Sequence, residues 1–205
     1  MLRAGGLLGL AAVIGTALVA ITYIGTHEKS AENEREFLMR SLTAIVPEST
    51  FDNDIFNDTI TVVSPRLLGT PNAVTVYRAR RNGEPVAVVL TPVAPDGYNG
   101  NIKLLIAIRF DGSLGGVRVV AHRETPGLGD DIEIERSSWI TTFNNHSLDN
   151  LNVSRWRVKK DGGEFDQFTG ATITPRAIVK AVYQSLQYFA ANRDALFAIE
   201  KQDEQ

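Results

Sequence analysis

Apolar side chains fill the first part of the chain, and no charged side chain interrupts them between Ala4 and Thr26. A helix needs about 20 predominantly apolar residues to cross the hydrocarbon core of a bilayer. The run is longer than the apolar part of a signal peptide, which is about 7–15 residues, and no clear A-x-A cleavage site follows it. We therefore expect a single-pass transmembrane helix over residues 1–27. Cleavage after the run, which would release a secreted protein, is the alternative.

The spacing of apolar residues becomes helical after this run. Phe37, Leu38, Leu42 and Ile45 recur at intervals of a helical face with charged residues between them, and Pro47 ends the pattern. This pattern predicts a stalk helix within residues 28–50.

Short β-type runs then follow, separated by turn residues. The runs cover residues 59–63, 73–80, 85–92, 103–110, 116–121 and 155–158, and the expected turns are Asn82-Gly83, residues 95–97 and Asp111-Gly112. Because both Asn and Gly tolerate positive φ, Asn82-Gly83 predicts an antiparallel hairpin.

The last apolar pattern is helical again. Thr174 is suited to the N-cap and Pro175 to the first helical position, before an apolar face formed by Ile178, Ala181, Val182, Leu186 and Phe189. Successive strands with helices at the two ends of the chain predict an α+β fold, namely a largely antiparallel sheet with flanking helices over residues 51–205.

Composition narrows the function. The 205 residues carry 21 basic and 24 acidic side chains, so there is no basic excess for nucleic acid. The chain has no cysteine, which excludes disulfides, thiolate-bound iron–sulfur clusters, cysteinyl flavins and haem c. The three histidines, His27, His122 and His146, have no metal-ligand spacing, so we expect no metal site. Redox chemistry here would need an organic cofactor or a metal bound by histidine and carboxylate side chains, and the histidine spacing favours the organic cofactor.

One candidate site lies just before the C-terminal helix, in the segment Asp166-Gln167-Phe168-Thr169-Gly170-Ala171-Thr172. Free N–H groups and the positive end of the helix dipole favour a phosphate at such a position, and Gly170 and Ala171 leave the approach open. The Thr172 hydroxyl is therefore suited to a phosphoester. An ordinary turn and helix cap is the alternative reading.

A second candidate is the loop His122-Arg123-Glu124-Thr125-Pro126-Gly127-Leu128-Gly129, which follows a predicted strand. Its proline and glycines make a constrained turn whose backbone can approach a planar ligand, and Leu128 can pack against a ring. A purely structural loop is the alternative, and neither segment decides the function alone.

Taken together, the two segments resemble the FMN-binding domain of the G subunit of Rnf-type electron transport complexes and of the related C subunit of sodium-translocating NADH:quinone oxidoreductases. Four motifs occur in the order of the G subunit, and the apolar N-terminus fits as well: Ala94-Pro95-Asp96-Gly97-Tyr98, the loop from His122 to Gly129, Lys159-Lys160-Asp161-Gly162-Gly163, and the segment from Asp166 to Thr172.

This resemblance implies covalent FMN, attached by a flavin transferase through a phosphoester to Thr172, the last residue of its motif. It also implies that Tyr98, Glu124, Thr125 and Leu128 line the isoalloxazine ring. Thr169 and Gly170 would lie near the phosphate, and Lys159 or Lys160 would contact the flavin. Thr174, two residues beyond the motif, is then expected to act only as the helix cap.

The resemblance further implies a place in the cell and partners. The flavin domain would lie on the extracytoplasmic, periplasmic side of a bacterial inner membrane, and other subunits of an Rnf-type complex would exchange electrons with it. The chain would be an electron carrier in a translocase and not a complete enzyme. A membrane-anchored scaffold or sensing module that binds FMN without relaying electrons is the competing hypothesis.

Overall fold

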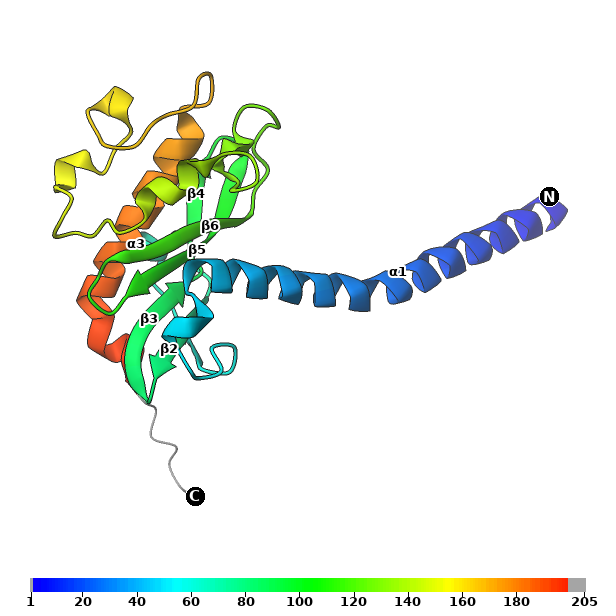
Figure 1. The fold of residues 1–205 in the computed structure, drawn as a ribbon. Coiled ribbons are helices and arrows are strands. Elements are labelled where there is room, and N and C mark those ends of the chain that lie inside the picture. The colour runs from blue at the N-terminus through cyan, green and yellow to red at the C-terminus, as the bar shows by residue number, and fades with distance from the viewer. Residues whose placement is uncertain (1, 199–205) are drawn as a thin grey trace. The chain divides into compact units, whose positions relative to one another are not determined.

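The computed structural model describes residues 2–198, except for the side chains of residues 2–4, 7, 8, 11, 21, 22 and 24–35. The chain divides into two units, one up to Arg40 and one from Ser41 onward. Helix α1 (Leu2–Ile45) is continuous and ends two residues before Pro47, as the stalk pattern predicted (Figure 1).

Large apolar side chains are exposed on α1. Leu10, Val13, Ile14, Leu18 and Val19 are each between 52% and 70% exposed. In the part of the chain that is described, no helix meets the length and apolarity needed to cross a membrane. The predicted anchor, residues 1–27, includes Met1 and several side chains that lie outside the described residues.

Within residues 41–198, six strands form one antiparallel sheet: β1 (Thr59–Val62), β2 (Val74–Arg81), β3 (Glu84–Leu90), β4 (Val93–Gly97), β5 (Gly100–Arg109) and β6 (Leu114–Ala121). β3 and β4 share one edge of β5, where β3 pairs with residues 106–109 and β4 with residues 100–103. β6 pairs along the opposite edge of β5. The sheet and its helices confirm the α+β architecture.

The remaining described elements are short, apart from one long helix. They are η1 (Glu48–Thr50), α2 (Pro65–Leu68), η2 (Asp130–Ile132), η3 (Ser138–Phe143), η4 (Val153–Arg155), η5 (Lys159–Asp161) and the long helix α3 (Ile173–Phe197). Most of the segment between β6 and α3 is thus irregular. Aromatic contacts support it. Phe143 stacks on Phe165 with ring centroids 4.5 Å apart, and Trp139 meets Phe168 edge to face with centroids 5.1 Å apart.

Local turn chemistry predicted one hairpin correctly and misplaced another turn. Asn82 and Gly83 have φ of 53° and 81°, and they join β2 to β3 as predicted. Residues 95–97 are not a turn but the end of β4, and the turn follows at Tyr98 and Asn99. A register shift between Ala94 and Gly97 accommodates Pro95 and Asp96 in the strand.

Two further predictions were wrong in detail. The β-type run 155–158 is not a strand, because η4 ends at Arg155 and only Val158 makes a bridge, to Phe165. Helix α3 begins at Ile173, so Thr172 and not Thr174 occupies its N-cap. A buried acceptor on another segment, the Glu124 carboxylate, takes the Thr174 hydroxyl away from capping.

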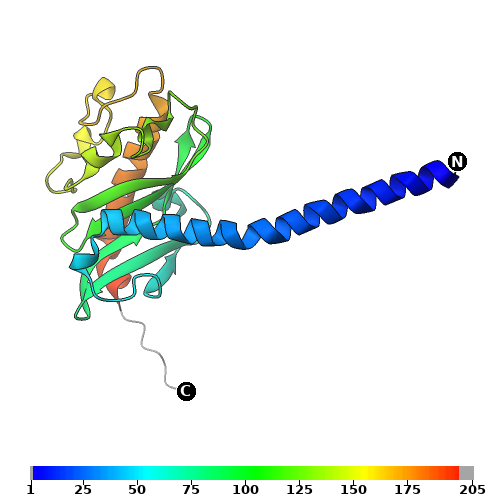
Figure 2. The same ribbon diagram turned by 45° about the vertical axis from the view of Figure 1, so that its right-hand side comes forward.

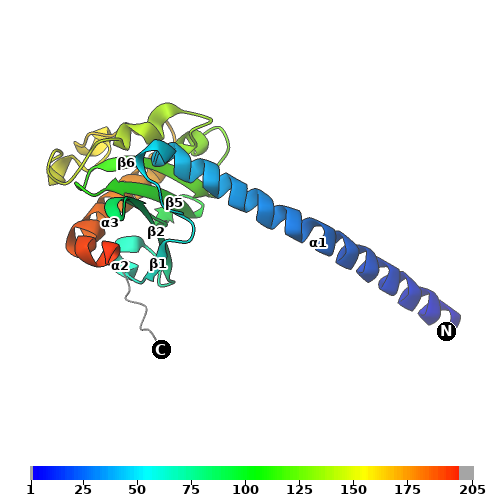
Figure 3. The same ribbon diagram turned by 60° about the horizontal axis from the view of Figure 1, so that its bottom comes forward.

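Helix α3 covers one face of the sheet, where it packs on β3, β4 and β5 (Figures 1, 2 and 3). Its predicted apolar face is buried there, together with alternate residues of β5 such as Leu104, Ile106 and Ile108. The other face carries Ile45, whose side chain lies so close to Gly116 that a Cβ there would approach it to 2.8 Å. The sheet therefore has an apolar layer on both faces.

The C-terminal end of α3 is held by a buried ion cluster. The Asp58 carboxylate pairs with Arg78 at 2.5 Å and with Arg80 at 2.9 Å. The two guanidinium groups donate to the carbonyls of Ala198 and Phe197, both at 2.8 Å. Cations at this position satisfy the last carbonyls of the helix and complement its dipole.

Replacing the shared carboxylate should destabilise the domain. Asp58→Asn leaves two largely buried guanidinium groups without a counter-charge, so we expect the free energy of unfolding to fall by about 2–4 kcal/mol. Chemical denaturation of the full chain in detergent measures the change. Asp194→Asn, which alters a solvent-exposed pair, is the control and should change the value by less than about 0.5 kcal/mol. Equal effects of the two variants would contradict the role of the cluster.

Candidate functional site

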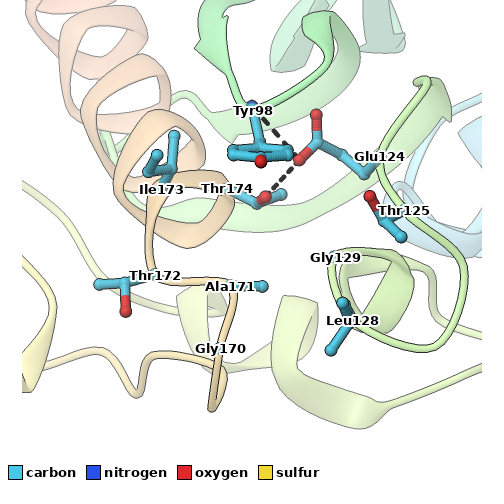
Figure 4. Close-up of a pocket in the computed structure, with 10 residues that line it drawn as sticks. All are labelled: Tyr98, Glu124, Thr125, Leu128, Gly129, Gly170, Ala171, Thr172, Ile173 and Thr174. Atoms are coloured by element: carbon cyan, nitrogen blue, oxygen red, sulfur yellow. Dashed lines mark hydrogen bonds between the residues drawn. The ribbon is translucent and has the colours of Figure 1, made fainter.

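Three segments meet around one cavity of about 210 Å³ (Figure 4). They are the tip of the β4–β5 hairpin, the loop after β6 and the entrance to α3. The residues that line the cavity are Tyr98, Glu124, Thr125, Leu128, Gly129, Gly170, Ala171, Thr172, Ile173 and Thr174. The two motifs singled out in the sequence thus share one cavity, although residues 130–165 separate them along the chain.

The Glu124 carboxylate joins the three segments, although it is only 4% exposed. It accepts hydrogen bonds from the backbone N–H groups of Tyr98 at 3.3 Å and Asn99 at 3.0 Å. Its third donor is the hydroxyl of Thr174 in the first turn of α3. We call these three bonds the Glu124 network. They satisfy a buried charge with donors from two distant parts of the chain.

The loop after β6 is fixed by its own hydrogen bonds. Gly127 adopts φ of +75°, and its N–H donates to the Asp130 carboxylate at 2.6 Å. The N–H of Glu124 donates to His122 Nδ1 at 3.0 Å, so His122 Nε2 carries the proton that faces Glu133 at 2.8 Å. His122 therefore supports the loop from behind and does not line the cavity.

The rim of the cavity is apolar and open. Tyr98 is 66% exposed, Leu128 48% and Ile173 46%. Exposed apolar groups around a partly polar cavity are typical of a ligand site.

The segment from Asp166 to Thr172 enters α3 through a tight turn. Gly170 has φ of +81°, and Ala171 N–H donates to the Phe168 carbonyl at 3.2 Å. Trp139 Nε1 donates to the Asp166 carbonyl at 2.8 Å and so anchors the start of the segment. In Figure 4 the Ala171 side chain points toward Thr125 and Leu128, whereas the Thr172 side chain points to the other side of the backbone.

Thr172 itself is half-buried and occupies the N-cap of α3, but its side chain makes no capping hydrogen bond. Its hydroxyl is therefore not engaged in the role that the alternative sequence reading gave it. Thr174, by contrast, is fully buried and its hydroxyl is bonded to Glu124.

Four predicted site residues are not among those that line the cavity: Lys159, Lys160, Asp166 and Thr169. Lys159 pairs with Asp166 at 2.7 Å, and Lys160 N–H donates to the side chain of Gln167 at 3.0 Å. These contacts stabilise the loop that leads to Thr172. Gly129 and Thr174 line the cavity, although the sequence did not predict either of them as a site residue. Gly129 belongs to the loop motif, and Thr174 follows the second motif by two residues.

Residues 97–187 match the FMN-binding domain family, and this range contains every residue that lines the cavity. Residues 1–45 match the RnfG N-terminal region. The whole chain is similar to subunits G of ion-translocating oxidoreductase complexes, for example those of Pseudoalteromonas atlantica, Vibrio atlanticus and Pseudomonas aeruginosa. The identities are 46% over 194 residues, 45% over 194 and 47% over 201, and the alignments cover 95–98% of this chain and 90–94% of the relatives. The chain belongs to this family of G subunits.

An ion pair near the start of α3 should make the stability of the domain depend on pH. Arg176 donates to both oxygens of Asp161 at 2.6 and 2.7 Å, and these bonds hold the pKa of Asp161 below its ordinary value of 3.8. A carboxylate whose pKa is lower in the folded state stabilises the fold at pH values above its pKa in the unfolded state. This contribution is lost as the pH falls through its pKa in the folded state. Asp161→Asn should therefore be less stable than wild type at pH 7, and the difference should close on acidification below pH 3.8.

Denaturation curves of both proteins at stepwise lower pH measure this difference. Asp149→Asn, on an exposed carboxylate that forms no ion pair in the described structure, is the matched control and should follow wild type throughout. A gap between wild type and Asp161→Asn that stays as wide at pH 3 as it is at pH 7 would argue against the pair.

Proposed function

We propose that this chain is a membrane-anchored flavoprotein subunit that relays electrons through FMN held by a phosphoester on Thr172. The observation that carries the proposal is the cavity shared by the two motifs, because its lining residues include Thr172, whose hydroxyl makes no capping hydrogen bond. Membership of the G-subunit family supports FMN as the cofactor and an ion-translocating oxidoreductase complex as the setting.

Attachment is a phosphoryl-type transfer from FAD that a flavin transferase catalyses. The Thr172 oxygen forms a bond to the phosphorus of the FMN half, the pyrophosphate bond of FAD breaks, AMP leaves and the hydroxyl proton is released. Thr174 is a poor acceptor for the same group, because its hydroxyl is buried and already donates to Glu124. The dipole and the free N–H groups at the start of α3 favour the phosphate on Thr172.

The remaining residues of the cavity hold and shield the cofactor. When bound, FMN supplies one- and two-electron chemistry that ordinary side chains lack. Tyr98 and Leu128 offer exposed apolar surface to a planar ring. A cavity of about 210 Å³ is below the ~300–1,000 Å³ of most small-molecule sites. The chain therefore encloses part of the flavin and leaves the rest accessible to a neighbouring electron donor or acceptor.

The setting of the subunit in the cell is part of the same proposal. We place residues 1–27 in the bacterial inner membrane as a single span, and the flavin domain on the periplasmic side, with the other subunits of the complex as electron partners. The apolar side chains exposed along α1 support a lipid environment for that helix.

Covalent attachment is tested by the mass of the chain. Wild type coexpressed in membranes with a flavin transferase should gain the mass of one FMN and show in-gel flavin fluorescence after denaturation. Thr172→Ala should lose both, because the acceptor oxygen is gone. Ser154→Ala, which removes an exposed hydroxyl outside the cavity, is the control and should keep them. An unmodified wild type, or a modified Thr172→Ala, would refute the assignment.

The anchor is tested by fractionation. The full chain should stay in the membrane pellet after an alkaline carbonate wash, whereas a chain that begins at residue 28 should be released. Loss of the N-terminal peptide from the membrane-bound protein would favour cleavage. Release of the full chain by the wash would contradict a transmembrane helix.

A further inference from the structure

We propose that Glu124 and Thr174 are a positioning pair, which holds Tyr98 in a fixed place relative to the attachment residue Thr172. This inference rests on the proposed function, and it gives Glu124 a different role from a direct contact to the flavin. The Glu124 network already engages the carboxylate from the protein side.

The hydrogen-bonding capacity of Glu124 is the first argument. An ionised carboxylate offers about four acceptor sites. Three donors of this chain already use them, and the side chain is only 4% exposed. A buried acceptor with these partners has little capacity left for a ligand, whereas it fixes each donor that it binds.

Close packing around the carboxylate is the second argument. A Cβ at Gly97 would lie 3.0 Å from Glu124 Oε1 and 2.2 Å from the Gly100 carbonyl oxygen. A Cβ at Gly129 would lie 3.0 Å from Glu124 Cβ and 3.2 Å from Thr174 Oγ1. Side chains are absent at both points where the hairpin and the loop approach Glu124, which lets the network form at short range.

The third argument is that the Glu124 network binds Tyr98 at one end and the start of α3 at the other. The Tyr98 ring is 66% exposed, so burial does little to restrict it, and its backbone N–H is bonded to Glu124. At the other end, Thr174 lies two residues after Thr172 in the same helical entrance. Figure 4 shows Glu124 between the hairpin and the start of α3, with one bond to each. One carboxylate thus connects the residue suited to pack on the ring with the segment that carries the tether.

A second bond ties the same hairpin to the same loop, because the Asn99 amide donates to Thr125 Oγ1 at 3.2 Å. This contact is exposed and joins two neutral groups, whereas the Glu124 bonds are charge-assisted and are buried or partly buried. We therefore expect the Glu124 network to dominate the position of the hairpin tip.

A matched pair of substitutions tests the role. Thr174→Val removes the hydroxyl at nearly constant volume, and Thr174→Ser keeps it. In full-length chains coexpressed with a flavin transferase, both variants should carry FMN by mass, because Thr172 is unchanged. Thr174→Val should lose the visible circular dichroism induced in the flavin, since the ring is no longer held in one orientation. Thr174→Ser should retain it.

A second readout needs no flavin. In a Thr172→Ala background, adding Thr174→Val should raise amide exchange at Tyr98 and Asn99 about tenfold, because one charge-assisted bond of the network is lost. Amides in the β5–β6 ladder should exchange as before. If Thr174→Val does not accumulate, Glu124→Gln serves instead, because the amide presents a donor where the network needs an acceptor.

The outcomes separate this inference from the proposed function. A wild type without the FMN mass would overturn the proposed function and this inference with it. Modified chains in which Thr174→Val matches wild type in dichroism and exchange would overturn the positioning role alone. Loss of the dichroism in Thr174→Ser as well would do the same, because the hydroxyl would then not be the feature that matters.

Discussion

The site depends on one buried negative charge. Removing a carboxylate from water is costly unless hydrogen bonds replace the lost hydration. Glu124 receives this replacement from two backbone N–H groups and one hydroxyl, none of them a cation. Since these donors belong to the β4–β5 hairpin and to α3, the charge is satisfied only when all three walls of the cavity are in place. The cavity is therefore a property of the assembled domain and of no single motif.

Helix α3 is held at both ends by charges that suit its dipole. The Glu124 carboxylate lies at its N-terminal turn, and Arg78 and Arg80 donate to its last carbonyls. Between these ends the helix buries an apolar face on the sheet. The apolar contact fixes which face the helix presents, and the charged contacts limit movement along its axis. Thr172, at the first of these ends, is thereby given a defined place at the cavity.

Local sequence patterns correctly predicted those structural features that depend only on residues close together in the chain. Asn82-Gly83 specified its hairpin because positive φ is a local requirement, and the apolar face of α3 followed from its period. The failures involve contacts between distant segments. Pro95 was read as a turn although an edge strand admits it, and Thr174 was read as a cap although Glu124, 50 residues earlier, binds its hydroxyl. The helix and turn propensities of a residue do not depend on a partner that is distant in the sequence. The candidate residues came from motifs and resemblance. Only the fold shows which of them share the cavity, because Lys159, Lys160, Asp166 and Thr169 do not line it.

Thr172 and Thr174 show how two identical side chains acquire different environments. Successive residues of an α-helix are rotated by about 100°, so positions two apart face nearly opposite sides of the axis. Thr172 already has helical φ and ψ of −70° and −24°, and the rule applies to this pair. When Thr174 faces inward to Glu124, Thr172 must face outward, as Figure 4 shows. The bond that buries one hydroxyl thus presents the other, and the spacing of two residues follows from the helix itself.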